Sequence, residues 1–260
     1  MGHREERWLP LLRRLTEDQP RWLVYKGVGT AFGGTGDVDT VAPREDWNAV
    51  SEIFTDWAVQ QRLGAAVLCD HVPNVRHLVA LDPDSPFFFE MDVNCRKIFL
   101  GSTLFRPPDL LPLTRTDPRG FRHLRPGVEG LLKLVQNGAH RGGRPNWEGI
   151  RTKGITELLA SDLDGVTRGS VLFGWGAPSI RKLADAVVRG EWDRAAMMRV
   201  EAFCAARAVR EPDAVAMRLQ FRRVRAACPL LQVVFSGRAV PADRDAWLAE
   251  VGRKHEVLQP

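Results

Sequence analysis

The feature that most constrains this chain is a pair of acidic residues directly after a glycine-rich loop. Residues 27–36 contain five glycines in ten positions, and Asp37-Val38-Asp39 follows at once. Such glycine density indicates a loop, and the apolar residues that follow indicate a strand. Because alternate strand side chains share one face, Asp37 and Asp39 are expected side by side. Adjacent carboxylates repel each other and a divalent cation relieves the repulsion, so the pair indicates a metal site. The alternative is that Asp37 ends the turn and Asp39 is solvated at a strand edge.

A second acidic segment supports the metal interpretation. Residues 87–94 read Phe-Phe-Phe-Glu-Met-Asp-Val-Asn, so two acids interrupt an apolar strand. A buried carboxylate without a cation, a donor or water is strongly unfavourable. Glu90, Asp92 and Asn94 would share one strand face and line a polar site beside the first acidic pair. The alternative is an edge strand with one solvated face.

The periodic segments predict an α+β fold in two parts. Apolar spacing predicts helices over residues 4–15 and 43–62 and strands over residues 22–25, 38–41, 67–68, 77–81 and 87–93. Five prolines in residues 106–126 indicate a linker. Helical spacing follows over residues 128–135, 155–163, 180–188, 194–210, 213–227 and 242–251. We therefore predict an α/β domain with a small mixed sheet over residues 1–112 and an all-helical domain over residues 113–260.

Charge divides the chain in a similar way. Residues 1–104 carry 11 Lys and Arg against 15 Asp and Glu, whereas residues 105–260 carry 26 against 17. This division suits a cleft in which one side holds a metal and the other holds phosphate. The alternative is that the basic half is an arginine-rich solvated helical surface. Neither a C2H2 nor an RNP pattern accompanies the basic half, so nucleic acid is not the favoured partner.

Composition also predicts the compartment. No apolar run approaches the roughly 20 residues that cross a bilayer, so no membrane partner is expected. Residues 1–15 do not resemble a secretory signal, and we expect a cytoplasmic protein. The four cysteines lie far apart, which favours reduced, buried thiols over disulfides or a zinc site. The sequence does not indicate an oligomeric state.

The order of these features resembles the nucleotidyltransferase fold of the DNA polymerase β-like superfamily. The matching order is a strand, a glycine-rich loop, a G-D-V-D strand, a helix and a further acidic strand. More closely, W-L-V-Y-K-G followed by G-D-V-D-T-V-A-P is similar to small bacterial nucleotidyltransferase-like proteins. The resemblance covers residues 20–112 and is loose over the helical part.

This resemblance implies a reaction and the residues for it. Asp37 and Asp39 match the paired metal ligands of the family, and Asp92 matches its third carboxylate. The family is metal-dependent, so Mg²⁺ or Mn²⁺ is implied as cofactor and a nucleoside triphosphate such as ATP as co-substrate. The implied enzyme moves a nucleoside monophosphate to a hydroxyl or phosphate of a small-molecule acceptor and releases pyrophosphate. In this mechanism Asp92 activates the acceptor.

Phosphate contacts are expected from the glycine-rich segment. Lys26-Gly27 or Gly33-Gly34 stands where the family keeps a Gly-Ser pair, and Thr35 offers one of two hydroxyls in this loop. Residues 28–36 are too rich in glycine to predict the helical turn of the family. This departure leaves open a degenerate, non-catalytic binding protein. The basic half leaves open a nucleotidyltransferase that modifies RNA or protein.

Further basic and imidazole groups are weaker candidates. Lys133, Arg141 and Arg144 lie where a predicted helix ends in a glycine loop, and they are candidates to close over the triphosphate. The alternative is a solvated helix end stabilised by cations. His71 and His77 flank a predicted turn and lack a third metal ligand, so we expect them at the surface.

Overall fold

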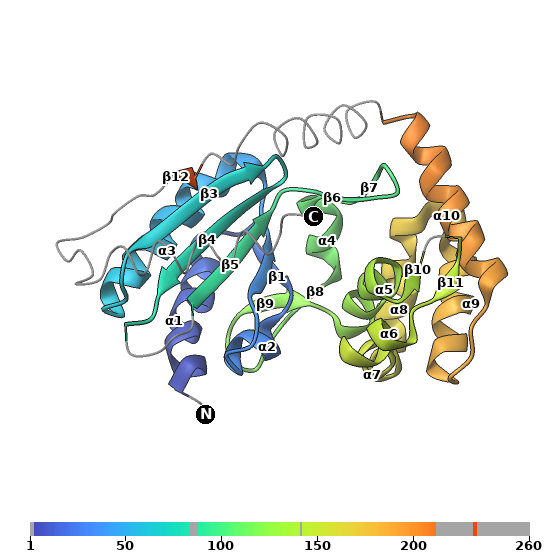
Figure 1. The fold of residues 1–260 in the computed structure, drawn as a ribbon, viewed down its shortest axis with the longest axis horizontal. Helices are drawn as coiled ribbons and strands as arrows, with labels where there is room; N and C mark the ends of the chain where they lie inside the picture. The colour runs from blue at the N-terminus through green and yellow to red at the C-terminus, as the bar shows by residue number, and fades with distance from the viewer. Residues whose placement is uncertain (1–2, 84–87, 141, 212–230, 233–260) are drawn as a thin grey trace.

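The computed structural model describes residues 3–83, 88–140, 142–211 and 231–232. The fold is α+β, with a mixed sheet and its covering helices on one side and a group of helices on the other (Figure 1). The predicted fold class is therefore confirmed. Within the described ranges, no helix combines the length and apolarity needed to cross a membrane.

The main sheet is mixed and brings together strands that are distant in the sequence. Its order is β12-β3-β4-β5-β2-β1-β9-β8, in which the β2–β5 and β1–β9 pairs are parallel and the other pairs are antiparallel. The strands are β1 (Leu23–Lys26), β2 (Val38–Val41), β3 (Ala66–Val72), β4 (Val75–Leu81), β5 (Phe88–Asn94), β8 (Thr114–Thr116), β9 (Arg122–Leu124) and β12 (Leu231–Gln232). The two acidic strands, β2 and β5, are thus neighbours near the centre of the sheet.

Two helices cover one face of this sheet. Helices α1 (His3–Asp18) and α3 (Trp47–Gln60) place an aromatic core against β4 and β5 (Figure 1). Trp8 stacks on Trp57 with ring centroids 5.4 Å apart, and both form T-shaped contacts with Phe89. Since alternate residues of a strand face opposite ways, the acids of β2 and β5 project from the other face of the sheet.

The helices of the second part pack around an apolar core to which residues of the sheet also contribute. Its helices are α5 (Pro126–Asn137), α6 (Trp147–Thr152), α7 (Ile155–Ser161), α8 (Leu163–Gly169), α9 (Ala177–Val188) and α10 (Arg194–Val209). A short hairpin of β10 (Ala139–His140) and β11 (Arg144–Pro145) follows α5. Leu23, Tyr25 and Val41 of the sheet belong to the same apolar cluster as these helices. The two parts are therefore joined by continuous packing.

The proline-rich segment is ordered structure and does not form the predicted linker. It contains α4 (Pro107–Leu110), a 3-10 turn (Leu111–Leu113), β8 and β9, so the sheet continues past residue 112 to Leu124. Another hairpin, β6 (Lys97–Phe99) and β7 (Ser102–Phe105), precedes it. Pro107, Pro112 and Pro126 occupy first-turn positions of short helices, where no backbone N–H is needed. Pro107 and Pro112 therefore lie in the first turns of elements that the sequence pattern concealed, whereas Pro126 starts the helix that the pattern predicts over residues 128–135.

The remaining predictions follow the elements with small shifts in their bounds. The predicted helix at 155–163 is two helices, α7 and α8, which meet at Asp162. The helices predicted over 213–227 and 242–251 lie outside the described residues. Cys69 and Cys204 are buried free thiols and Cys95 is a half-buried one, as expected, while Cys228 lies outside the described residues.

Candidate functional site

Four ionisable side chains form a row across four neighbouring strands of the sheet. Lys26 of β1 pairs in register with Asp39 of β2, Asp39 pairs with Asp92 of β5, and Asp92 pairs with His77 of β4. Register partners project from the same face of a sheet. The row therefore runs from an ammonium group through two carboxylates to an imidazole, on the face of the sheet that α1 and α3 leave uncovered.

A one-residue register shift in β1 places Lys26 in this row. Val24 pairs with Thr40, but the next pair is Lys26 with Asp39, so Tyr25 has no direct partner on β2. An extra residue of this kind re-aims the side chains that follow it. Tyr25 and Lys26 consequently project to the same face, and Lys26 Nζ lies 3.0 Å from Asp39 Oδ2. Without the shift, the Lys26 side chain would enter the aromatic core under α1.

Asp37 completes a cluster of three carboxylates with Asp39 and Asp92. One carboxylate oxygen from each residue lies within 4.8 Å of the other two. Asp39 is only 6% exposed, whereas Asp37 and Asp92 are half-buried. Asp37 precedes β2 and Asp39 lies within it, so the local D-x-D spacing supplies two of the acids and the neighbouring strand supplies the third. The structure thus brings together the three residues predicted as metal ligands.

The electrostatics of the cluster favour a bound cation. Burial raises the pKa of Asp39 to about 6; the ammonium of Lys26 opposes this rise, and the charges of Asp37 and Asp92 add to it. For Lys26, burial lowers the pKa of the ammonium, but the pairing with Asp39 and the charges of Asp37 and Asp92 together produce a net rise. Three converging carboxylate oxygens are a donor set that suits Mg²⁺ or Mn²⁺. The residues present therefore fit the metal that the sequence implies.

The turn between β1 and β2 contains a short helix that the glycine content concealed. The glycine content of residues 28–36 predicts no helix, but Val28–Phe32 form α2. Gly27 starts it with φ +90°, and an added Cβ would lie 2.4 Å from the carbonyl oxygen of Asp37. Thr30 Oγ1 donates to the carbonyl oxygen of Gly27 at 2.8 Å and closes the turn. Glycine is thus required where the backbone passes the acidic pair, and the turn itself is helical.

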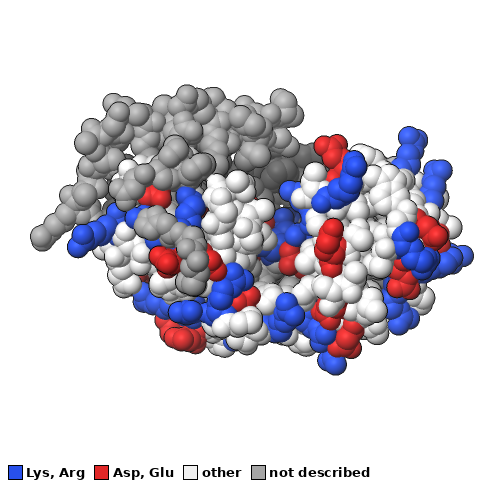
Figure 2. Space-filling model, turned by 90° about the horizontal axis from the view of Figure 1, so that it is seen from below, with Lys and Arg blue, Asp and Glu red and all other residues white. Residues whose placement is uncertain are grey.

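The acidic pair opens onto a cleft of about 500 Å³ between the sheet and the helical part. Asp37 and Asp39 lie in one wall with Lys26 and Gly27, and Lys133 of α5 and Lys153 at the end of α6 lie in the wall that the helices supply. Figure 2 shows a hollow between the two parts with acidic and basic side chains at its wall. The sheet wall thus carries Asp37 and Asp39 with Lys26, and the helical wall carries Lys133 and Lys153 with Glu129.

The hairpin of β8 and β9 adds charged side chains that the sequence did not single out. Arg115, Asp117, Arg119 and His123 all line the cleft. Arg119 pairs with Asp117 at 2.7 Å and also contacts Glu5 at 3.0 Å, so its guanidinium is held in place. The sequence signal for these residues was only a basic, proline-rich segment, and its pairing with β1 was not visible without the fold.

Several predicted contacts lie elsewhere. Gly33, Gly34 and Thr35 follow the far end of α2 and are not among the described residues that line the cleft. A Cβ at Gly34 would approach Arg4 of α1, and the Thr35 hydroxyl donates to the backbone of Thr30. The reason is that α2 turns the chain away from the cleft between Gly27 and Asp37.

The basic candidates of the helical part divide in the same way. Lys133 lines the cleft and pairs with Glu129 at 2.6 Å one helical turn away. Arg144 lies on the β10–β11 hairpin, outside that lining, and Arg141 lies outside the described residues.

Asn94 is buried and its side chain donates to the backbone oxygen of Thr40 at 3.2 Å, so it ties β5 to β2.

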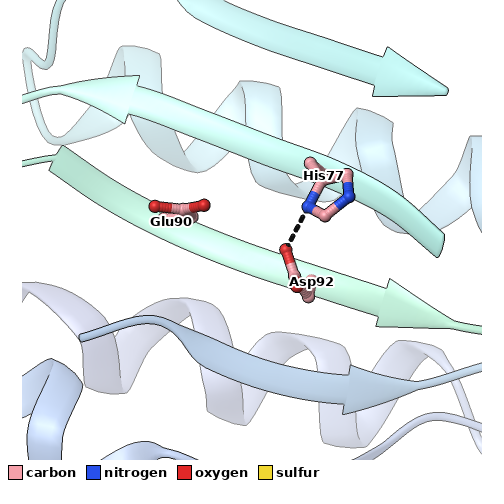
Figure 3. A group of neighbouring side chains, drawn as sticks. All are labelled: His77, Glu90 and Asp92. Carbon is pink, nitrogen blue, oxygen red and sulfur yellow. Dashed lines mark hydrogen bonds and ion pairs between the residues drawn. The ribbon is translucent and has the colours of Figure 1, made fainter. Parts of the chain in front are cut away.

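The expectation of a surface His77 is wrong. Its side chain is 15% exposed, and Nδ1 lies 2.6 Å from Asp92 Oδ1 (Figure 3). Burial lowers the pKa of the His77 imidazole, but the hydrogen bond to Asp92 and the nearby acids produce a net rise. The signal was present as alternation, because His77 stands two residues from the buried Val79 on one strand face. The side chain of His71 lies outside the described residues.

No family model matches this chain, and no curated protein matches it. Among solved structures, it is similar to the crystal structure of JHP933 from Helicobacter pylori, with 11% identity and a TM-score of 0.38 over 86% of this chain and 96% of that chain. That similarity is too low to support an inference about fold or activity.

Proposed function

We propose that this chain is a metal-dependent nucleotidyltransferase that moves a nucleoside monophosphate from a nucleoside triphosphate to a small-molecule acceptor. The acceptor group is a hydroxyl or a phosphate, and pyrophosphate leaves. The observation that carries the proposal is the convergence of Asp37, Asp39 and Asp92 within 4.8 Å. The first two open onto a cleft whose other wall presents ammonium groups. The resemblance of residues 20–112 to nucleotidyltransferase-like proteins supports the same conclusion.

The three carboxylates would hold Mg²⁺ or Mn²⁺, which when bound neutralises phosphate charge and acidifies an acceptor hydroxyl. The remaining work falls to side chains of the chain itself. Lys133 and Lys153 bring positive charge to the cavity wall opposite Asp37 and Asp39, where a triphosphate needs it. Asp92 is oriented by its hydrogen bond to His77. In the proposed reaction, Asp92 takes the proton of the acceptor hydroxyl. Positioning and charge neutralisation supply most of the rate in this class of reaction.

The test is ligand-dependent stability followed by turnover. Thermal unfolding is measured with each of the four nucleoside triphosphates, with and without Mg²⁺ or Mn²⁺, on wild type, Asp37→Asn and Asp92→Asn. Binding to the native state raises the unfolding temperature by mass action. We expect a rise that needs both metal and nucleotide in wild type and is lost in both variants. Pyrophosphate release with candidate acceptors then measures transfer.

Glu52→Gln is the matched control, since Glu52 is an exposed carboxylate of α3 that lies outside both the cleft lining and the carboxylate cluster. It should retain the metal-dependent rise. A rise without any pyrophosphate release, across sugar, alcohol and phosphate acceptors, would favour the non-catalytic binding protein instead. Transfer of label to RNA or protein would shift the acceptor class. The absence of a rise with any nucleotide and metal would overturn the proposal.

A further inference from the structure

A second group of metal-binding side chains adjoins the carboxylate cluster. One ligand atom from each of His77, Glu90 and Asp92 lies within 4.8 Å of the other two. His77 comes from β4 and the two acids from β5, where Glu90 and Asp92 stand two residues apart on one face (Figure 3). The side chains of His77 and Asp92 are 15% and 16% exposed. The group is therefore shielded but still reachable by a small ion.

The donor atoms of this group differ from those of the carboxylate cluster. The first cluster offers oxygen alone, which is the preference of Mg²⁺. The second offers an imidazole nitrogen with two carboxylate oxygens, and this mixture suits Mn²⁺, Fe²⁺, Co²⁺ or Zn²⁺ better than Mg²⁺. One imidazole and two carboxylates on rigid neighbouring strands are also held close without movement of the backbone.

Asp92 belongs to both groups. Its two carboxylate oxygens allow it to face Asp37 and Asp39 on one side and His77 on the other, because β5 lies between β2 and β4. A bridging carboxylate would place two cations next to each other along the row of ionisable side chains.

We propose that His77, Glu90 and Asp92 form a second cation site, selective for a first-row transition metal over Mg²⁺. The site goes beyond the proposed function, since it requires only these three side chains and would bind its ion in a protein that transfers nothing. The competing explanation is that His77 is only a hydrogen-bond partner that orients Asp92. The two explanations differ in whether nitrogen enters the coordination sphere of the ion.

The experiment uses the full chain, with Mn²⁺ as probe and excess Mg²⁺ as competitor. Equilibrium dialysis counts the Mn²⁺ ions per chain that excess Mg²⁺ does not displace. Pulsed electron paramagnetic resonance detects nitrogen-14 coupling to these ions. For wild type we expect one Mg²⁺-resistant equivalent with nitrogen coupling. His77→Asn should lose that equivalent and the coupling. Its amide can still donate to Asp92, so an orienting hydrogen bond is retained.

Two further variants keep the test decisive. Asp39→Asn should lose the Mn²⁺ that Mg²⁺ displaces and retain the nitrogen-coupled ion. Glu90→Gln leaves the His77–Asp92 hydrogen bond intact and should lose the resistant ion, and it replaces His77→Asn if that variant fails to fold by thermal unfolding without metal. An unchanged count in folded His77→Asn or Glu90→Gln, or the absence of nitrogen coupling in wild type, would overturn this inference. Nucleotide binding does not enter these readouts, so failure of the proposed function would be seen separately.

Discussion

Lys26 Nζ lies 3.0 Å from Asp39 Oδ2, so the protein places its own cation beside the carboxylates that are predicted to bind metal. The contact depends on the register shift at Tyr25, which turns Lys26 onto the acidic face. The ammonium offsets only part of the free-energy cost of ionising Asp39 in this buried acidic cluster, because the pKa of Asp39 remains raised, to about 6. The arrangement therefore makes separate predictions for Lys26, for Asp39 and for the turn that joins their strands.

Lys26→Met should strengthen metal binding in the absence of nucleotide. The ammonium competes with an added cation for Asp39, whereas methionine keeps much of the apolar stem and removes the charge. An ion pair of this partial exposure contributes about 1 kcal/mol, so the affinity for Mn²⁺ should rise roughly fivefold. Affinity for a nucleoside triphosphate with metal present should fall, because the cleft loses a positive charge. Isothermal titration calorimetry measures both.

The control for this change is Lys182→Met. Lys182 forms an ion pair of 2.7 Å with Asp193, but its side chain is 71% exposed and lies outside the cleft of the acidic pair. Neither affinity should change. Weaker Mn²⁺ binding in Lys26→Met would contradict the idea that this ammonium competes with the metal.

The raised pKa of Asp39 predicts how the stability of the metal-free protein depends on pH. A carboxyl whose folded-state pKa lies above its unfolded value stabilises the fold below the unfolded pKa, near 3.8, and that contribution is lost as pH rises through about 6. Full ionisation removes on the order of 3 kcal/mol. Asp39→Asn has no such titration. In EDTA, the free energy of unfolding of wild type relative to Asp39→Asn should therefore fall between pH 4.5 and pH 7.5.

Urea unfolding at the two pH values measures this difference. The pKa of His77 is also raised, and its contribution is likewise lost as pH rises, but His77 is present in both proteins and largely cancels from the comparison. Excess Mg²⁺ should restore the stability of wild type at pH 7.5 and leave Asp39→Asn nearly unchanged. Parallel pH profiles for the two proteins in EDTA would contradict the prediction.

The acidic cluster could be predicted from the sequence because the pattern that indicates it lies within two short segments. Asp37-Val38-Asp39 and the acids of residues 87–94 alternate with apolar residues, and alternation alone assigns them to strand faces. The burial cost of acids in an apolar strand placed the second acidic segment beside the first, the family resemblance singled out Asp92, and the register of β2 and β5 pairs Asp39 with Asp92. The fold class followed from the same alternation and from the helical spacing of the second half.

The features that the sequence missed depend on pairing between distant strands. A shift of one residue turns every later side chain to the opposite face, and nothing in the local pattern marks Tyr25 as the extra residue. His77 reached the site because β4 pairs with β5, and Arg119 because β9 pairs with β1. The helical turn after Gly27 was hidden by glycines whose intrinsic preference is against a helix.

Gly27 and Gly29 should respond in opposite ways to the same substitution. Gly27 has φ +90°, and an added Cβ would lie 2.4 Å from the Asp37 carbonyl oxygen, a contact with backbone that cannot give way cheaply. Gly27→Ala should therefore lower the free energy of unfolding by about 2–4 kcal/mol and displace Asp37. Gly29 lies in α2 with open space around an added Cβ, so Gly29→Ala should be neutral or stabilising by up to about 1 kcal/mol.

Urea unfolding and Mn²⁺ titration of the two variants test this contrast. If Gly27 serves only stability, a Gly27→Ala protein that is still folded at low temperature will bind Mn²⁺ as wild type does. If the turn positions the acidic pair, that folded protein will bind Mn²⁺ at least about tenfold more weakly, because a metal site is sensitive to small displacements of its ligands. Gly29→Ala should bind Mn²⁺ as wild type does in either case. Equal losses of stability in the two variants would show that the left-handed backbone at Gly27 is not required.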